Sequence, residues 1–303
     1  MAGCGSNVST YANPYSVYYS DYASGTASLR YFAQDLCVTE DVNFGTASVN
    51  STLAESAGVF DIEDGEVVYS QNMFQKMYPA STTKILTAYI ILKYGNLDDE
   101  ITVSYEAAHP GSDSSRCGLK TGDMITVGEV LYGMVLESGN DAAIALSEYY
   151  AGSIEAFAEV MNEEALKLGA THSHFTNPSG LPDENHYTTL YDMYLILQAA
   201  VQVDGFTDYF GTAVHEANYY AENGAPVTKT WKNTCRYLTG ETDTPEGFTI
   251  LAAKTGTTNA AGYCLCLYSE NEKGKPFISI VYKAEERADM YVLMGQILKA
   301  YAN

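Results

Sequence analysis

Short apolar runs near both ends of the chain predict β-strands. They lie at residues 58–62, 66–69, 248–253, 262–268 and 277–282. Glu63-Asp64-Gly65 separates the first two runs and is a typical hairpin turn signal. The last two runs suit an antiparallel pair across the polar residues 271–275. We therefore expect a sheet that contains strands from both ends of the chain.

The middle of the chain, from about residue 95 to residue 203, has apolar residues at helical spacing. Amphipathic segments occur at 126–135, 157–168 and 189–197, and again at 287–301. Thr126 and Glu129 form a capping box before the first segment, and Gly169 is a natural stop for the second. The first of these helices is expected to end next to Ser138.

This order of elements predicts the fold class. Strands, a long helical insertion, more strands and a terminal helix indicate an α/β (α+β) protein in which helices flank an antiparallel sheet. The insertion at about 95–203 predicts an all-helical lobe. We expect the active site at the junction between the sheet and this lobe.

Composition narrows the classes of protein and partner. The chain has 303 residues with 46% hydrophobic content, which is enough for a large folded core. It has 16 basic and 38 acidic residues, and a net charge of −22 argues against nucleic acid or an anionic membrane surface as a partner. No apolar run approaches the ~20 residues of a membrane-spanning helix.

The N-terminal part has a different composition from the rest. Residues 1–48 are rich in Tyr and Ser, and we interpret them as a tail or linker before a domain at 49–303; the tyrosines suit an adhesive role as an alternative. Met1-Ala2-Gly3-Cys4 is similar to the end of a bacterial lipoprotein signal. A lipid anchor at Cys4 is therefore one possibility, and an ordinary exposed cysteine is the other.

Cysteines and histidines indicate neither a metal site nor a cofactor. No Cys or His set has the spacing of metal ligands, and no glycine-rich loop suits a nucleotide phosphate. We expect buried free thiols, with a bridge from Cys235 to Cys264 or Cys266 across strands as the alternative.

Ser81 and Lys84 form the first motif with chemistry, within Pro79-Ala80-Ser81-Thr82-Thr83-Lys84. Residues three apart share a helix face, so the lysine amine can reach the serine hydroxyl. A helix start also provides free backbone N–H groups that stabilise an oxyanion. For the amine to act as a base, burial and a second positive charge must lower its pKa.

Two later segments complete a pattern. Ser138-Gly139-Asn140 and Lys254-Thr255-Gly256 follow in the order known for serine penicillin-interacting enzymes. With Phe175-Thr176-Asn177-Pro178-Ser179-Gly180-Leu181 and His186-Tyr187-Thr188-Thr189, the chain resembles the D-alanyl-D-alanine carboxypeptidases among the low-molecular-mass penicillin-binding proteins. The resemblance covers roughly residues 55 to 300. A second Lys-Thr-Gly, at 120–122, precedes Ser138 and continues into an aspartate, so we assign it to a turn.

The resemblance implies a β-lactamase/transpeptidase-like fold and a mechanism. It implies that Ser81 attacks the peptide carbonyl, Lys84 accepts its proton and Ser138 relays a proton to the leaving D-alanine. The substrate-binding residues that it implies are Asn140, Lys254, Thr255, Gly256 and Thr257. The expected partners are peptidoglycan stem peptides and, as covalent inhibitors, β-lactam antibiotics, outside the cytoplasm in a bacterial cell envelope.

Two other functions suit parts of the pattern. Serine β-lactamases share the three motifs, but the class A enzymes use a glutamate that has no counterpart around His174 to Pro178. A non-catalytic wall-binding module would explain the tyrosines but would not need all the motif residues. Many relatives continue with a β-rich domain and a membrane-binding helix; here one predicted helix follows the last strand, which leaves membrane attachment open.

Overall fold

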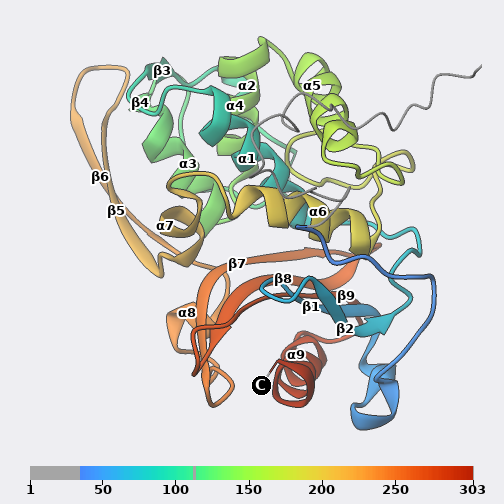
Figure 1. Ribbon diagram of the computed structural model, residues 1–303. Helices are drawn as coiled ribbons and strands as arrows, with labels where there is room; N and C mark the ends of the chain where they lie inside the picture. Colours follow the sequence, from blue (N-terminus) through green and yellow to red (C-terminus); the bar gives the residue numbers. More distant parts are fainter. Residues whose placement is uncertain (1–34, 112–113, 303) are drawn as a thin grey trace, which may run out of the picture. The chain divides into compact units, whose positions relative to one another are not determined.

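The computed structural model of the protein describes residues 35–111 and 114–302. An antiparallel five-stranded sheet in the order β2-β1-β9-β8-β7 is its main β element (Figure 1). The strands are β1 (Ala54–Asp61), β2 (Glu66–Gln71), β7 (Phe248–Thr258), β8 (Gly262–Asn271) and β9 (Pro276–Ala284). β1 pairs with β9 along its length, so the prediction of one sheet from both ends of the chain is confirmed.

Helices cover both faces of this sheet (Figure 1). α9 (Arg287–Tyr301) packs on one face and α6 (Leu190–Ala200) packs on the other. Successive strand residues point to opposite faces. Ile280 therefore joins the core shared with the helical lobe, whereas Val281 joins the core beneath α9. Such two-sided burial explains why apolar residues occupy successive positions in places, as at Leu265-Cys266-Leu267 on β8.

The helical lobe lies above the sheet in Figure 1. Besides α6 it contains α1 (Lys84–Tyr94), α2 (Tyr105–Ala108), α3 (Val127–Leu136), α4 (Asn140–Ala151), α5 (Ile154–Lys167) and α7 (Phe206–Gly211). Two short strands, β3 (Glu100–Thr102) and β4 (Met124–Thr126), pair at its edge. One half of the predicted capping box is present, since the Thr126 hydroxyl accepts from the Glu129 N–H at 3.3 Å. The Glu129 carboxylate pairs with His215 at 2.8 Å instead of completing the box. The fold class predicted from the sequence is thus confirmed.

A projecting β-hairpin was not predicted. β5 (Val214–Tyr220) and β6 (Pro226–Lys232) form a long two-stranded ribbon beside the lobe and extend the β3–β4 pair into a second sheet (Figure 1). Most of its side chains alternate between exposed and half-buried, and Ala217 and Trp231 are among the few that are buried. Polar residues at most positions hid the strand pattern. The short helix α8 (Arg236–Thr239) follows.

Residues 35–48 contact the sheet and the lobe, although we predicted a tail up to residue 48. Cys37 is buried and its N–H donates to the Tyr194 hydroxyl at 2.7 Å. Phe44 and Ser70 form an isolated β-bridge. The compact unit begins at Asp35, whereas the predicted boundary was residue 49. The 1–34 part of the predicted tail, including Cys4, lies outside the described residues.

The five cysteines in the described part of the chain, Cys37, Cys117, Cys235, Cys264 and Cys266, are buried and free. Free thiols were the first expectation, and the alternative bridge from Cys235 is not formed. Among the helices of the described ranges, none combines the length and apolar character needed to cross a bilayer.

Candidate active site

The three sequence motifs meet where β7 passes beneath the helical lobe. Ser81 lies in η4, a short 3₁₀ helix (Ala80–Thr83), and Lys84 is the first residue of α1. Ser138 lies in the turn between α3 and α4, and Lys254 lies on β7. The Lys84 Nζ is 3.1 Å from the Ser81 Oγ, and the Lys254 Nζ is 3.0 Å from the Ser138 Oγ. Segments far apart in sequence thus bring two Ser–Lys pairs into the same site.

Gly256 allows β7 to approach η4 closely. A Cβ atom at this position would lie 2.9 Å from the Ser81 nitrogen, closer than real Cβ atoms come, and 3.0 Å from the Pro79 oxygen, which is an unusually tight contact. Ala80 in the same turn has a φ of 47°, which is unusual for a residue with a side chain. From the resemblance, we expected Gly256 to be one of the substrate-binding residues. The structure shows that it also leaves room for the backbone of Ser81.

Lys84 is completely buried, at 0% exposure. Its Nζ lies 2.7 Å from the Asn140 Oδ1 and 2.8 Å from the Ser179 carbonyl oxygen, besides its contact with Ser81. Burial holds the pKa of Lys84 well below its usual range, and the charge of Lys254 lowers that pKa further, while Asp141 acts in the opposite direction. The site therefore favours the neutral amine.

The partners of Lys84 orient this amine. A neutral amine has two N–H bonds and one lone pair, and a carbonyl oxygen can only accept a hydrogen bond. The carbonyl-type oxygens of Asn140 and Ser179 therefore take both N–H bonds. The remaining lone pair faces the hydroxyl of Ser81, which is the geometry needed to remove its proton.

Ser138 and Lys254 form the second pair. Ser138 is buried and has a φ of 56°, so its backbone holds a sparsely populated conformation at the end of α3. Lys254 is 1% exposed, and burial lowers its pKa to about 7, with the thiols of Cys235 and Cys266 opposing the shift. Its Nζ also donates to the Thr255 carbonyl at 3.2 Å.

Asp141 positions the segment that borders Asn140. Its buried carboxylate accepts hydrogen bonds from the backbone N–H groups of Cys117, Gly118, Leu119 and Ala142, at 2.7–3.1 Å. The Asn140 N–H donates to the Ser115 carbonyl at 2.8 Å. These bonds attach the loop at 115–119 to the start of α4 and so bring Ser115 next to the site.

Two pockets are lined by Ser81, and Ser115 lines both of them as well. One has a volume of about 140 Å³ and is lined by Ser138, Thr234, Thr255, Thr257, Tyr263 and Arg287, among others. The other, of about 430 Å³, is lined by Asn140, Ser179, Leu181, Pro182, Thr258 and Asn259, among others. Among the described residues that line the two pockets, none has a carboxylate side chain.

The family model described as D-alanyl-D-alanine carboxypeptidase matches residues 43–286, which is most of the chain. The chain belongs to this carboxypeptidase family. It is 34% identical over 218 residues to the D-alanyl-D-alanine carboxypeptidase DacF of Bacillus subtilis, covering 70% of this chain and 53% of the relative. It is 33% identical over 272 residues to DacC of Escherichia coli K12, covering 87% and 64%.

The chain thus spans between half and two thirds of the length of these curated carboxypeptidases. A solved structure gives a fuller match. The crystal structure of the Streptomyces K15 DD-transpeptidase aligns with a TM-score of 0.76 and 27% identity, covering 82% of this chain and 96% of that one. The resemblance to this family that we inferred from the motifs is therefore confirmed.

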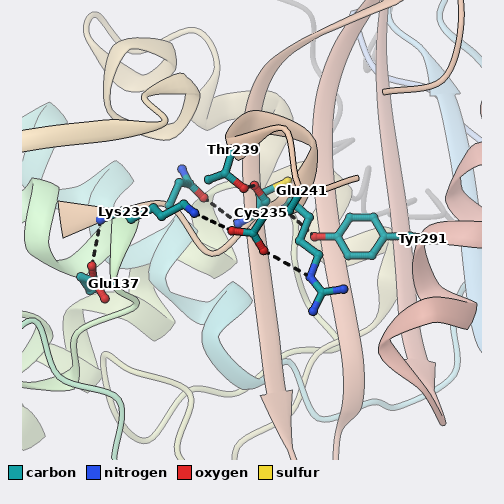
Figure 2. A network of polar contacts seen from close by, with 8 residues as sticks. Glu137, Lys232, Cys235, Thr239, Glu241 and Tyr291 are labelled. Carbon is teal, nitrogen blue, oxygen red and sulfur yellow. Dashed lines mark hydrogen bonds and ion pairs between the residues drawn. The ribbon is translucent and has the colours of Figure 1, made fainter. Parts of the chain in front are cut away.

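In this member of the carboxypeptidase family, a polar network fixes one wall of the smaller pocket (Figure 2). The Glu137 carboxylate, next to Ser138, accepts from the Lys232 N–H at 2.8 Å. The Lys232 ammonium pairs with Glu241 at 2.6 Å, and the Arg236 N–H donates to the Tyr291 hydroxyl at 2.8 Å. These contacts tie the end of β6 and α8 to α3 and α9, and they hold Thr234 between them.

The sequence motifs did not identify several residues of the site. Ser115, Thr234, Tyr263 and Arg287 line the smaller pocket because the fold brings four separate segments together there. The sequence marked Asp141 only as the residue that follows Ser138-Gly139-Asn140, with no indication of its role. The predicted turn at Lys120-Thr121-Gly122 is present, with Gly122 at a φ of 83° and the Lys120 N–H bonded to Asp123, so that motif is not part of the site.

Proposed function

We propose that the protein is a serine-type D-Ala-D-Ala carboxypeptidase that removes the terminal D-alanine of peptidoglycan stem peptides. One observation supports this most strongly. The buried Lys84 Nζ lies within hydrogen-bond distance of the Asn140 Oδ1, the Ser179 carbonyl oxygen and the Ser81 Oγ, so that in the neutral amine the two carbonyl-type oxygens accept the N–H bonds and the lone pair is left for Ser81. The curated relatives are named D-alanyl-D-alanine carboxypeptidases, which gives the substrate class.

In acylation, the Ser81 Oγ attacks the carbonyl of the penultimate D-alanine and Lys84 takes its proton. The backbone N–H groups of Ser81 and Thr257 are the proposed oxyanion donors, because Thr257 lies on the strand that Gly256 brings against Ser81. Losing one such donor costs about 10² to 10³ in rate. Asn140 lines the larger pocket and is proposed to bind the substrate amide there.

The leaving D-alanine departs through the smaller pocket. Ser138 relays a proton to the nitrogen of this D-alanine, supported by the Lys254 Nζ at 3.0 Å. The free carboxylate of the leaving D-alanine needs cations and hydroxyl donors. Thr255 and Thr257 provide the hydroxyls, and Arg287 adds a guanidinium at the same pocket. A substrate with a blocked C-terminus would lose these contacts.

Water is the proposed acceptor of the acyl group, and β-lactams are proposed to acylate Ser81 and leave slowly. Class A β-lactamases deacylate through a glutamate. Among the described residues lining the two pockets, no carboxylate occupies that role. Rapid sustained turnover of benzylpenicillin by the purified protein would favour a β-lactamase instead.

Acyl transfer to an amine is a second candidate reaction, because the Streptomyces K15 structure is titled a DD-transpeptidase. Adding an amine acceptor such as glycylglycine to the peptide assay separates the two. Formation of a new peptide product at the expense of the hydrolysis product would favour transfer.

The decisive assay measures D-alanine release from diacetyl-Lys-D-Ala-D-Ala, with Ser81→Ala as the inactive control. Labelling of the wild type by a fluorescent penicillin, absent in the same variant, would locate the acyl group. A wild type that neither releases D-alanine nor labels would favour the wall-binding module.

The peptidoglycan substrate places the action of this family in the cell envelope. A lipid anchor at Cys4 is our finer proposal, based on Met1-Ala2-Gly3-Cys4. Incorporation of radiolabelled palmitate in cells expressing the wild type, and its loss in Cys4→Ser, would support it.

A further inference from the structure

Asn177 organises a turn that presents a backbone carbonyl to Lys84. Its Oδ1 accepts four hydrogen bonds, from the N–H groups of Ser179 (3.2 Å), Gly180 (2.8 Å) and Leu181 (3.1 Å) and from the Ser179 hydroxyl (3.0 Å). Asparagine side chains that bond to the following backbone in this way stabilise tight turns. With the turn closed, the Ser179 carbonyl lies 2.8 Å from the Lys84 Nζ.

Contacts with α1 and η4 hold this turn in place. The Thr87 hydroxyl of α1 donates to the Pro178 carbonyl at 2.7 Å. Gly180 packs directly on η4, since a Cβ atom there would lie 1.7 Å from the Ala80 oxygen. The turn therefore has little freedom to move away from the Ser81–Lys84 pair.

His186 joins the same turn to η4. Its Nδ1 accepts from the Thr176 N–H at 3.1 Å, because a backbone N–H can only donate. The Nε2 therefore holds the proton and donates to the Thr83 hydroxyl at 2.9 Å. Burial lowers the pKa of His186 to about 4, so the ring is neutral when the enzyme works near neutral pH.

We propose that Asn177 is a positioning residue for the general base: by fixing the Ser179 carbonyl, it occupies one N–H of neutral Lys84 and so directs the lone pair to Ser81. The proposal rests on the proposed function, because it concerns the base of the acylation step. Asn177 touches no reacting atom in this scheme. Its effect passes through the turn and the Ser179 carbonyl.

The charges around Lys84 make the proposal testable by pH. Lys254 on β7 and Asp141 on α4 act on Lys84 in opposite directions, and His186 is neutral. A carboxylate at position 177 would retain the oxygen that accepts the four hydrogen bonds of the turn, and these donors would keep it ionised. It would lose the Asn177 Nδ2 donor to the Leu181 carbonyl at 3.1 Å and to the Thr176 hydroxyl at 3.2 Å. The carboxylate would add a negative charge near Lys84 and so raise the pKa of its amine. At acidic pH a larger fraction of Lys84 would then be protonated and unable to act as the base.

The test uses Asn177→Asp and Asn177→Ala in the full chain, with the acylation rate of a fluorescent penicillin measured from pH 4.5 to pH 9. We expect Asn177→Asp to keep a larger share of the wild-type plateau than Asn177→Ala, with its acidic limb moved to higher pH by about one pH unit. Asn177→Ala loses the acceptor of the turn, so its plateau should fall by about tenfold or more.

Asn162→Ala is the matched control for fold stability. Asn162 also bonds to the backbone at the start of this loop, at the Phe175 N–H and carbonyl and at the Ala158 carbonyl, each at 2.8 Å, but it is not connected to Lys84. We expect it to lower the melting temperature while leaving the acylation plateau and the acidic limb unchanged.

Two outcomes are distinguishable. If the wild type labels, but the limb of Asn177→Asp stays in place and Asn177→Ala keeps the wild-type plateau while its melting temperature falls, as we expect for Asn162→Ala, Asn177 is structural and the proposal is overturned. If the wild type itself fails to label, the proposed carboxypeptidase function fails instead.

Discussion

At the scale of single residues, the site depends on two lysines that the fold buries almost completely. Lys84 is 0% and Lys254 is 1% exposed. Removing an ammonium group from water costs several kcal/mol, so burial favours the neutral amine. The hydrogen-bond partners then decide what each amine does. Lys84 faces Ser81 with two carbonyl-type acceptors behind it, whereas Lys254 contacts the Ser138 hydroxyl.

Lys84→Arg tests the role of the first amine. A guanidinium stays charged at any pH in the working range and cannot accept the Ser81 proton. We expect acylation by fluorescent penicillin to fall by at least about 10³, because general-base catalysis supplies up to about 10⁴. Retained labelling in a variant with a normal circular dichroism spectrum would contradict the assignment.

The lowered pKa of Lys254 allows a prediction of how the stability of the protein depends on pH. Burial lowers its pKa to about 7 in the folded protein, compared with about 10.4 in an unfolded chain. Between these values the unfolded chain binds more protons, so the free energy of unfolding rises with pH, by at most about 1.4 kcal/mol per pH unit. Below the lower value this contribution is constant, because the lysine is then charged in both states.

Urea unfolding of the wild type and Lys254→Met from pH 7 to pH 9 measures this contribution. The methionine variant lacks the titrating group, while other groups titrate in both proteins. We expect the free energy of unfolding of the wild type, minus that of the variant, to increase with pH. A constant difference would mean that Lys254 remains charged in the folded protein.

At the scale of elements, the contact between β7 and η4 sets the geometry of the site. β7 ends in Lys254-Thr255-Gly256-Thr257-Thr258, and its Gly256 lies against the backbone of Ser81. The network around Lys232, Arg236 and Glu241 supports the neighbouring wall from the end of β6 (Figure 2). Several separate segments therefore form the walls of the smaller pocket, which Thr255 lines.

Gly256→Ala tests this contact. The new Cβ atom would clash with backbone atoms of Ser81 and Pro79, which cannot move as a flexible side chain can. We expect β7 to move away from η4 and the acylation rate to fall by about 10² or more, since small displacements of reacting groups are costly.

Gly295→Ala in α9 is the control for this substitution. Its Cβ atom meets only the Pro245 ring, at 3.9 Å, and alanine favours a helix more than glycine by about 1 kcal/mol. Labelling should be unchanged in this variant, whereas equal losses in the two variants would argue against a special role for Gly256.

At the scale of the whole molecule, the two ends of the chain close one sheet around a helical insertion. β1 lies between β2 and β9, so the strands that precede the helical lobe pair with strands that follow it. The segment at 35–48 adds to this unit through buried Cys37 and the bridge between Phe44 and Ser70. We therefore propose that the folded domain begins before residue 49.

Comparing two truncated chains checks this boundary. One begins at Asp35 and the other at Val49. We expect the shorter chain to be less stable by at least about 2 kcal/mol, because it loses the buried Cys37 side chain and the bonds to Tyr194 and Ser70. Equal melting temperatures would instead support the boundary at residue 49.

Much of the molecule follows from local sequence. The Thr126–Glu129 cap, the helix at 287–301 and the hairpin at Glu63-Asp64-Gly65 are present because capping, helical periodicity and turn preferences act over a few neighbouring residues. The same kind of short pattern predicted the motif residues Ser81, Lys84, Ser138 and Lys254, which the fold brings together in two Ser–Lys pairs. The β5–β6 hairpin was missed because solvent-exposed strands need few apolar side chains.

The remaining features arise from contacts between distant segments, which a linear pattern does not encode. The sequence shows that Lys84 has a serine one turn away, but not that the Asn140 amide and the Ser179 carbonyl take up its N–H bonds. Similarly, Arg287 reads as the start of a helix and becomes part of a pocket only when α9 packs beside β8. The residue types determine which hydrogen bonds and charges are available. The tertiary structure determines which of them form, because the direction and burial of each side chain depend on every segment that converges at the site.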